Sequence, residues 1–133
     1  MSTRSSRAVT IIDDDPIVQA LLEEFLLQRG VRSLKKAADG IEAKALYLNA
    51  MGKFDLILCD LNMPGFDGIE FLMHLRDENF AGVLLFVTGA LTTTVNAADQ
   101  LAKAYKISYL GYLRKPINFV ELDRLLMPLL STT

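Results

Sequence analysis

The sequence has few of the residues that form disulfides or soft metal sites. It holds one cysteine, Cys59, and one histidine, His74, in 133 residues. A single cysteine excludes a disulfide or a cysteine metal cluster within the chain, and a reducing compartment such as the cytoplasm is its simplest setting. His74 falls mid-helix and away from the acidic motifs, so we interpret it as a surface or structural residue. No apolar run is long enough to span a bilayer.

The sequence also has little excess of charge of either sign. The 14 lysines and arginines nearly balance the 16 aspartates and glutamates, which gives a net charge of −2. Without a basic cluster or a basic amphipathic face, the sequence indicates neither direct nucleic-acid binding nor membrane binding. The length and the ordinary apolar share of 51% predict one globular domain. We expect that domain at 8–130, after a flexible lead at 1–7 and before a frayed tail at 131–133.

Short apolar runs alternate strictly with segments of helical period. The runs are nearly continuous in apolar residues, as strands buried on both faces are. Strict alternation predicts right-handed crossovers and a parallel sheet with helices on both faces. We expect strands at 9–12, 32–37, 56–59, 83–87 and 109–114, the last broken by Gly111, and helices at 17–29, 41–51, 69–79, 95–105 and 118–130.

The helical period also predicts which side chains face the sheet. Asp15 before Pro16 has the pattern of a helix N-cap. Apolar residues three or four positions apart form one face of a helix. The expected core faces, in chain order, are Val18, Leu21, Leu22 and Phe25; Ile41, Ala45 and Leu48; Ile69, Leu72 and Met73; Ala98, Leu101, Ala102 and Tyr105; and Leu122, Leu125, Leu126 and Leu129.

Polar side chains stand where four of the predicted strands end. Asp13 and Asp14 follow the first strand, Asp60 the third, Thr88 the fourth and Lys115 the fifth. Parallel strands end at the same edge of a sheet, and ligands of such sheets bind outside that edge. We therefore expect these side chains to meet at one site.

Carboxylates gathered at one edge favour a bound cation. Two like charges about 4 Å apart cost roughly 1 kcal/mol in water and several times that at a partly buried site. A ligand set of oxygens, without histidine or cysteine, favours a hard metal such as Mg²⁺, which commonly bridges carboxylates to phosphate. An aspartate can itself attack phosphorus. Asp60, which stands alone at its strand end, is the candidate nucleophile, and Lys115 and Thr88 are candidate phosphoryl ligands.

Four short motifs resemble the signatures of one family. They are IIDDDP, DLNMPGFDG, VTG and YLRKP, they occur in this order, and each lies at the end of a predicted strand. Together they resemble the receiver domain of two-component response regulators, over roughly residues 8–130. The resemblance implies a flavodoxin-like, doubly wound five-stranded parallel sheet of order 2-1-3-4-5 with five helices.

The resemblance also implies the roles of individual residues at the acidic edge. Asp60 matches the phosphoacceptor. Asp14 matches a direct Mg²⁺ ligand, and Asp13 matches a partner that usually acts through water. Asn62 matches the residue whose backbone carbonyl completes the metal shell.

The remaining motif residues match the parts that respond to phosphorylation. Thr88 and Lys115 match the pair that senses the phosphoryl group. Tyr112 matches an aromatic switch that turns inward when the threonine moves. Pro116 follows the lysine where the family often has a cis peptide. Gly89 departs from the alanine that is usual after the threonine, which predicts a looser loop.

The function implied is a signalling switch rather than an enzyme. A sensor histidine kinase or a phosphotransfer protein would phosphorylate Asp60, and the domain would assist only its own phosphorylation and dephosphorylation. The segment 88–115 is longer than usual, with the extra length near 104–110, which alters the face that family members use for output and for phosphorylation-dependent dimers. LAKAYKISYLGYLRKPI faintly resembles receivers fused to cyclic-dinucleotide phosphodiesterase domains.

Two alternatives stay open at this point. Phosphohydrolases of the haloacid dehalogenase class also form an aspartyl-phosphate, but they need a second aspartate two residues after the nucleophile, where this chain has Asn62. A degenerate receiver would act only as a protein-binding module, and the intact acidic set argues against it. A dinucleotide-binding enzyme is disfavoured because no Gly-x-Gly-x-x-Gly follows the first strand.

Overall fold

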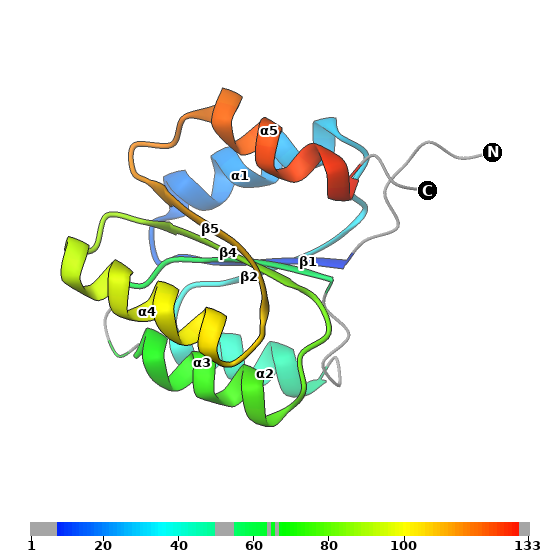
Figure 1. The fold of residues 1–133 in the computed structure, drawn as a ribbon. Coiled ribbons are helices and arrows are strands. Elements are labelled where there is room, and N and C mark those ends of the chain that lie inside the picture. Colours follow the sequence, from blue (N-terminus) through cyan, green and yellow to red (C-terminus); the bar gives the residue numbers. More distant parts are fainter. Residues whose placement is uncertain (1–7, 50–54, 64, 66, 131–133) are drawn as a thin grey trace.

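The computed structural model of the protein describes residues 8–49, 55–63, 65 and 67–130, without the side chains of 47–49. The predicted lead at 1–7 and tail at 131–133 lie outside these residues. Strands and helices alternate as the sequence predicts (Figure 1). They are β1 (Ala8–Ile12), α1 (Pro16–Gln28), β2 (Ser33–Ala37), α2 (Gly40–Asn49), β3 (Leu56–Cys59), α3 (Gly68–Asp77), β4 (Val83–Thr88), α4 (Thr92–Ala104), β5 (Ser108–Arg114) and α5 (Phe119–Leu130).

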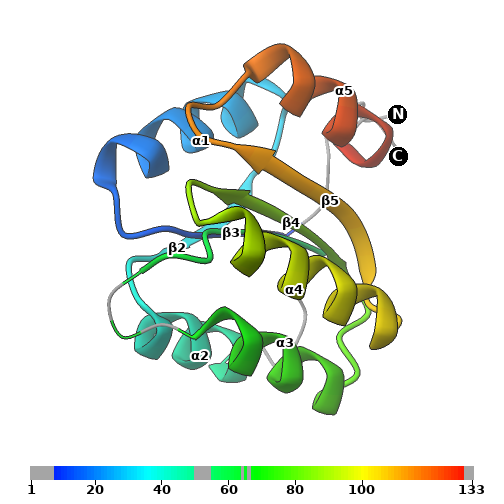
Figure 2. The ribbon, with the colours of Figure 1, turned by 60° about the vertical axis from the view of Figure 1, so that its left-hand side comes forward.

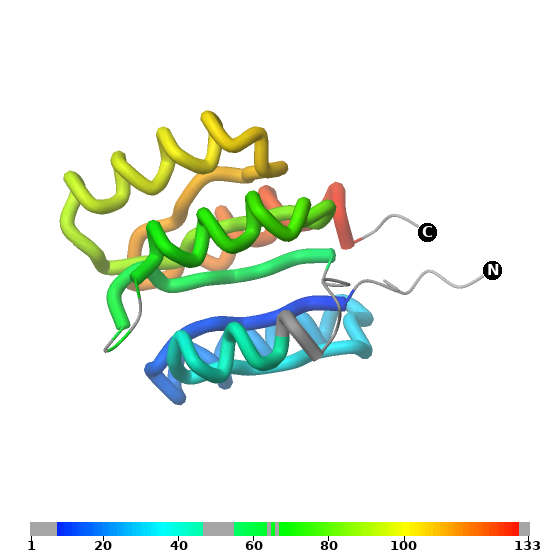
Figure 3. Tube along the Cα trace, turned by 90° about the horizontal axis from the view of Figure 1, so that it is seen from below, coloured from blue at the N-terminus to red at the C-terminus, as the bar shows by residue number. Residues whose placement is uncertain are grey.

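The five strands form one parallel sheet of order β2-β1-β3-β4-β5, which confirms the predicted topology (Figure 2). Helices α1 and α5 cover one face of the sheet, and α2, α3 and α4 cover the other (Figure 1). Seen from the second face, α2, α3 and α4 lie side by side (Figure 3). Each crossover returns the chain to the same end of the sheet, so all five strands end at one edge.

Two apolar layers hold the helices against the sheet. Leu22 and Leu122 belong to the layer beneath α1 and α5, and Phe71 and Ala98 belong to the layer beneath α2, α3 and α4. All four residues of β3 are buried, as expected for a strand with helices on both faces. Among the described residues, no helix combines the length and the apolar character that crossing a bilayer demands.

Polar side chains begin several helices. The Asp15 carboxylate accepts the Ile17 N–H at 2.9 Å, so the predicted N-cap of α1 is confirmed. Asp67 Oδ1 caps α3 in the same way, and Asn118 Oδ1 accepts from the first turn of α5. Helix α4 differs, since it follows Leu91 and has no side-chain cap.

Three helices expose residues that we expected in the core. Leu21, Ile41 and Met73 are 47%, 80% and 41% exposed. A helix turns by about 100° per residue, so Leu21 points a third of a turn away from the buried Leu22. Neighbouring positions shift Ile41 and Met73 in the same way.

The buried positions in those helices are offset from the expected ones. The buried side chains are Leu22, Phe25 and Leu26 in α1; Ala43 in α2; and Phe71, Leu72 and Leu75 in α3. The expected α2 residue Ala45 is exposed, and the side chain of Leu48 lies outside the description.

Among the described residues, helix bounds differ from the prediction by more than one residue at two places. Helix α4 begins at Thr92, three residues earlier than expected, because polar threonines are helical there without adding to the apolar period. Helix α3 ends at Asp77, two residues early, and Asn79 has a positive φ of 54° that is incompatible with a continued helix. The expected end of α2 at residue 51 lies outside the described residues.

Strand β5 contains a bulge at the predicted break. The register against β4 shifts by one between Tyr109 and Gly111, so Leu110 is an extra residue, and Gly111 adopts a φ of 110° that favours glycine. Tyr109 packs edge-on against Phe86, and Tyr112 pairs in register with the same Phe86. Without the extra residue, two tyrosines three positions apart would face opposite sides. The bulge brings both to the side of α4.

Candidate functional site

The side chains predicted at the strand ends meet at one edge of the sheet. Asp13 follows β1, Asp60 follows β3 and Lys115 follows β5. Oxygens of Asp13, Asp14 and Asp60 lie within 4.8 Å of one another. Asp13 and Asp60 are only 1% and 4% exposed, whereas Asp14 is exposed. The edge therefore carries a carboxylate cluster with two buried members and one open to solvent.

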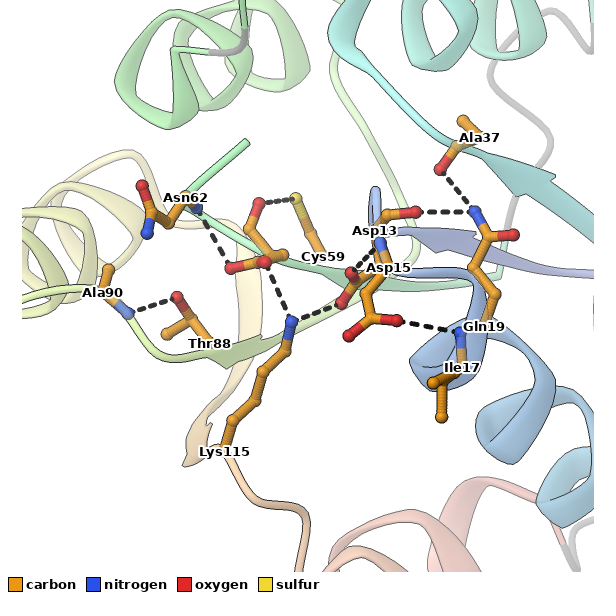
Figure 4. A network of polar contacts seen from close by, with 11 residues as sticks. Asp13, Asp15, Ile17, Gln19, Ala37, Cys59, Asn62, Thr88, Ala90 and Lys115 are labelled. Atoms are coloured by element: carbon orange, nitrogen blue, oxygen red, sulfur yellow. Dashed lines mark hydrogen bonds and ion pairs between the residues drawn. The ribbon is translucent and has the colours of Figure 1, made fainter. Parts of the chain in front are cut away.

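The Lys115 side chain reaches across the edge to two carboxylates. Its Nζ lies 2.8 Å from Asp13 Oδ2 and 3.0 Å from Asp60 Oδ2 (Figure 4). The other oxygen of Asp60, Oδ1, accepts the Asn62 backbone N–H at 3.0 Å. The ammonium thus sits between two carboxylates that would otherwise repel each other. The Lys115–Pro116 peptide is cis, as the sequence predicts.

Burial and charge oppose each other in this cluster. Burial raises the pKa of Asp13 above its ordinary 3.8, although Lys115 and the Asp15 N–H act to lower it. Burial lowers the pKa of Lys115, but its bonds to Asp13 and Asp60 outweigh burial and raise that pKa overall. Both pKa values can be raised because burial acts more strongly on Asp13 than on Lys115. The Asp13 side chain is 2% exposed, whereas that of Lys115 is 22% exposed.

Cys59 lies directly behind the cluster. Its side chain is fully buried, and burial, followed by the charges of Asp60 and Asp13, raises the thiol pKa well above its ordinary range. A thiol with a raised pKa is protonated at neutral pH and unreactive. Cys59 is therefore a small apolar core residue, as the sequence indicates.

Gln19, which we did not single out from the sequence, fastens the backbone behind the cluster. Its Nε2 donates to the backbone oxygens of Asp13 at 2.6 Å and Ala37 at 3.2 Å (Figure 4). The Asp15 N–H also donates to Asp13 Oδ1 at 2.9 Å. Helix α1 thereby joins the ends of β1 and β2. The sequence offered one signal for this contact, the position of the polar Gln19 beside Val18 on the predicted core face of the helix.

Thr88 ends β4 and is fully buried. Its Oγ1 accepts the Ala90 N–H at 3.0 Å, so the hydroxyl oxygen is engaged by its own loop (Figure 4). The Thr88 carbonyl accepts the Lys115 backbone N–H at 3.1 Å, which joins the ends of β4 and β5. Thr88 therefore lies at the expected edge of the sheet, and its hydroxyl is bound to the loop that follows β4.

Tyr112 lies on β5 and is 39% exposed. Arg114, two residues further along the same strand face, places its guanidinium carbon 5.8 Å from the centre of the Tyr112 ring. Its Nη1 donates to the Ala90 carbonyl, and its Nη2 donates to Thr92 Oγ1 at 2.9 Å. Sequence reasoning missed Arg114, because its partners lie more than 20 residues away along the chain.

The acidic cluster fits a hard divalent cation. Asp13 Oδ2 is buried, and among the described residues its partner is the Lys115 ammonium, which partly neutralises it. The three carboxylates offer only oxygen ligands, which suits Mg²⁺. Because Asp14 is open to solvent, the same cation could also contact oxygens of a phosphoryl group.

Residues 9–126 match the sequence profile of the response regulator receiver domain. The transcriptional regulatory protein MalR of Bacillus subtilis is 33% identical over 111 residues, which cover 84% of this chain and 45% of MalR. The cyclic di-GMP phosphodiesterase RocR of Pseudomonas aeruginosa is 28% identical over 118 residues, which cover 89% of this chain and 30% of RocR. The chain thus spans less than half the length of either relative.

Among solved structures, a chain of the CheX–CheY complex with BeF₃ and Mg²⁺ from Borrelia burgdorferi superposes with a TM-score of 0.77. The two sequences are 21% identical, and the superposition covers 92% of this chain and 87% of the other. At this identity the comparison establishes a shared fold only.

The sequence match, the strand order and the acidic edge agree with one another. The family match decides against the phosphohydrolase alternative, and the intact carboxylate cluster argues against a degenerate receiver. The chain belongs to the family of response regulator receiver domains, which are signalling switches of two-component systems.

Proposed function

We propose that Asp60 is the phosphoacceptor of this receiver domain. The single observation that carries the proposal is the convergence of a buried aspartate with two further carboxylates and the Lys115 ammonium at the open edge of the sheet. We propose a sensor histidine kinase or a phosphotransfer protein as the donor, and a cytoplasmic location, where a donor charged from ATP is present.

The proposed step is an in-line transfer to a carboxylate oxygen. An oxygen of Asp60 forms a bond to phosphorus while the phosphorus–nitrogen bond of a phosphohistidine breaks. The departing imidazole nitrogen keeps the electron pair of that bond and takes a proton from solvent. Asp60 becomes an acyl phosphate, and no oxidant or reductant is needed.

The carboxylates of Asp13, Asp14 and Asp60 and the backbone carbonyl of Asn62 would hold Mg²⁺. When bound, Mg²⁺ neutralises charge on the phosphoryl oxygens. Asp14 suits a direct ligand because it is open to solvent, and the buried Asp13 suits a partner acting through water.

Lys115, Thr88 and Tyr112 would respond to the new phosphoryl group. The Lys115 ammonium already contacts Asp60 and can follow the charge to a phosphoryl oxygen. The Thr88 hydroxyl can donate to another oxygen if its loop moves, and Tyr112 would then turn inward. This is a shift between two states of one domain, in which phosphorylation favours the second.

The output of the switch is also a proposal. The match to RocR supports the earlier hint of a cyclic-dinucleotide phosphodiesterase as a fused or separate output domain. A phosphorylation-dependent dimer through the α4-β5-α5 face is the alternative route to output.

The test is labelling of the purified chain by acetyl phosphate with Mg²⁺, followed by intact mass. We expect one added phosphoryl group on the wild type, none on Asp60→Ala, and normal addition to Asp77→Ala, which removes an exposed carboxylate of α3. Equal labelling of Asp60→Ala, or no labelling of the wild type, would reject the proposal. Loss of labelling with EDTA is expected as well.

A further inference from the structure

We propose that Arg114 is a positioning residue that holds the β4–α4 loop, residues 89–91, in its resting conformation and so sets how readily the phosphorylated state forms. The inference rests on the roles proposed above for Asp60 and Thr88. It adds Arg114, which lies within the YLRKP motif but to which the sequence assigned no role.

Arg114 holds the loop at two points. Its guanidinium donates to the Ala90 carbonyl in the middle of the loop and to Thr92 Oγ1 at the start of α4. Both bonds come from one rigid planar group with a permanent charge, which fixes the two acceptors relative to each other. The end of β5 and the beginning of α4 are thereby joined.

Ala90 connects this contact to the proposed sensor. Its N–H donates to Thr88 Oγ1 while its carbonyl accepts from Arg114. The two polar groups of one residue therefore link the threonine to the arginine. A loop movement that carries Thr88 toward a phosphoryl group on Asp60 would displace the Ala90 carbonyl and strain or break its bond with Arg114.

The N-terminus of α4 makes this external hold important. Helices α1 and α3 begin with the carboxylates of Asp15 and Asp67, which satisfy their first N–H groups. Helix α4 begins after Leu91, which is 77% exposed and offers no side-chain cap. A helix start without its own cap frays easily. The bonds from Arg114 supply polar contacts between this end of α4 and the end of β5, in addition to the apolar packing of the buried Val95.

Arg114 also reaches the proposed switch residue. Its guanidinium lies 5.8 Å from the Tyr112 ring, on the strand face that the β5 bulge turns toward α4. The contact favours the outward position of Tyr112. Release of the loop and inward movement of Tyr112 would therefore remove contacts of the same arginine, so Arg114 couples the two movements.

Contacts made in only one of two states shift the equilibrium toward that state. Arg114→Ala is therefore expected to favour the activated state. The measurement is the concentration of beryllium fluoride, a phosphoryl mimic, that half-saturates the domain at saturating Mg²⁺. We expect Arg114→Ala to bind the mimic about threefold to tenfold more tightly than the wild type. This is the range that one ordinary hydrogen bond spans, because solvent screens the charge of the exposed Arg114.

Mg²⁺ affinity in the absence of fluoride separates this role from general destabilisation. The carboxylate cluster makes no contact with the guanidinium among the bonds described, so we expect Arg114→Ala to leave Mg²⁺ affinity unchanged. Arg124→Ala is the matched control, because it removes an equally charged side chain paired with Glu121 on the exposed face of α5. The control should change neither affinity.

Two further variants extend the test. Thr92→Ala removes one acceptor of the guanidinium and is expected to tighten fluoride binding by a smaller factor. It also keeps the test decisive if Arg114→Ala does not fold. Arg114→Lys retains one donor and should restore part of the wild-type behaviour. Hydrogen exchange at the Ala90 amide should be faster in Arg114→Ala.

The outcomes distinguish this inference from the proposed function. Fluoride affinity of Arg114→Ala and Thr92→Ala equal to or weaker than that of Arg124→Ala would overturn the role of Arg114 alone. A wild-type domain that binds Mg²⁺ but never the mimic would overturn the phosphoacceptor proposal itself, and the inference with it.

Discussion

Asp13 and Asp60 lie just beyond strands whose backbone hydrogen bonds continue past the strand ends. The Asp13 N–H donates to the Ala37 carbonyl at 3.0 Å, and the Asp60 N–H donates to the Ile12 carbonyl at 2.9 Å. Gln19 adds two further bonds from α1. On the other side of the site, Ala90 in the loop after Thr88 is bound by two side chains, the buried Thr88 and the exposed Arg114.

The difference fits the proposed switch, in which the acidic half of the site stays fixed and the loop half moves. The acidic half must present carboxylates in a constant geometry, and main-chain bonds inside the sheet provide it. In the proposed switch the loop half adopts two conformations, and side-chain bonds at an uncapped helix start can break at small cost. The Arg114 variants described above test the loop half. The three predictions below test the acidic half, from the largest expected effect to the smallest.

The strongest way to break the acidic half is to change a carboxylate. Asp13→Asn removes one charge from the cluster while keeping its shape, and we expect Mg²⁺ affinity to fall on the order of tenfold to a hundredfold, as for other partners of a metal site. Isothermal titration checks this, with Asp77→Asn as the control. Unchanged affinity would remove Asp13 from the metal site.

Gln19→Ala attacks the support of the acidic half instead of its ligands. It leaves the buried carbonyls of Asp13 and Ala37 without the amide donor, so we expect the free energy of unfolding to fall by about 1–2 kcal/mol. Urea unfolding measures the loss, and Gln28→Ala, whose amide binds the exposed Glu24, should change little. If both variants are equally stable, Gln19 does not fasten this region.

The third prediction concerns how pH changes the stability of the metal-free domain, and its effect is smaller than those of the two variants above. Because burial raises the pKa of Asp13, the folded protein binds more protons than the unfolded chain as pH rises from 3.8 to the raised value. In that window the wild type loses stability relative to Asp13→Asn with rising pH. Urea unfolding in EDTA at several pH values measures this divergence. A constant difference would contradict it.

The sequence was sufficient for the topology and for the residues at the sheet edge. Asp13, Asp60 and Lys115 could be found because the ends of parallel strands meet whatever the details of packing. The helix faces were less predictable. Leu21 and Met73 lie next to buried leucines, and the rotation of a helix by one position depends on the packing of the sheet below it.

Contacts between distant side chains were beyond sequence reasoning. Gln19 and Arg114 are common surface residues, and nothing in their neighbourhood along the chain identifies Ala37 or Ala90 as a partner. Such pairs follow from the docking of α1 and α4 on the sheet. They surround the sheet-edge residues that the motifs had already singled out as candidates.

The extra residue in β5 affects how the sequence of this strand is aligned with the corresponding strands of other proteins. One inserted position shifts the phase of the side chains that follow it, so distance from the start of the strand no longer tells which layer a residue joins. For residues after the bulge, alternation counted backward from Lys115 assigns each side chain to the correct face of the sheet. Alternation counted forward from Ser108 assigns it to the opposite face. A comparison that places a gap on the wrong side of Leu110 would assign Tyr112 to the opposite layer of the domain.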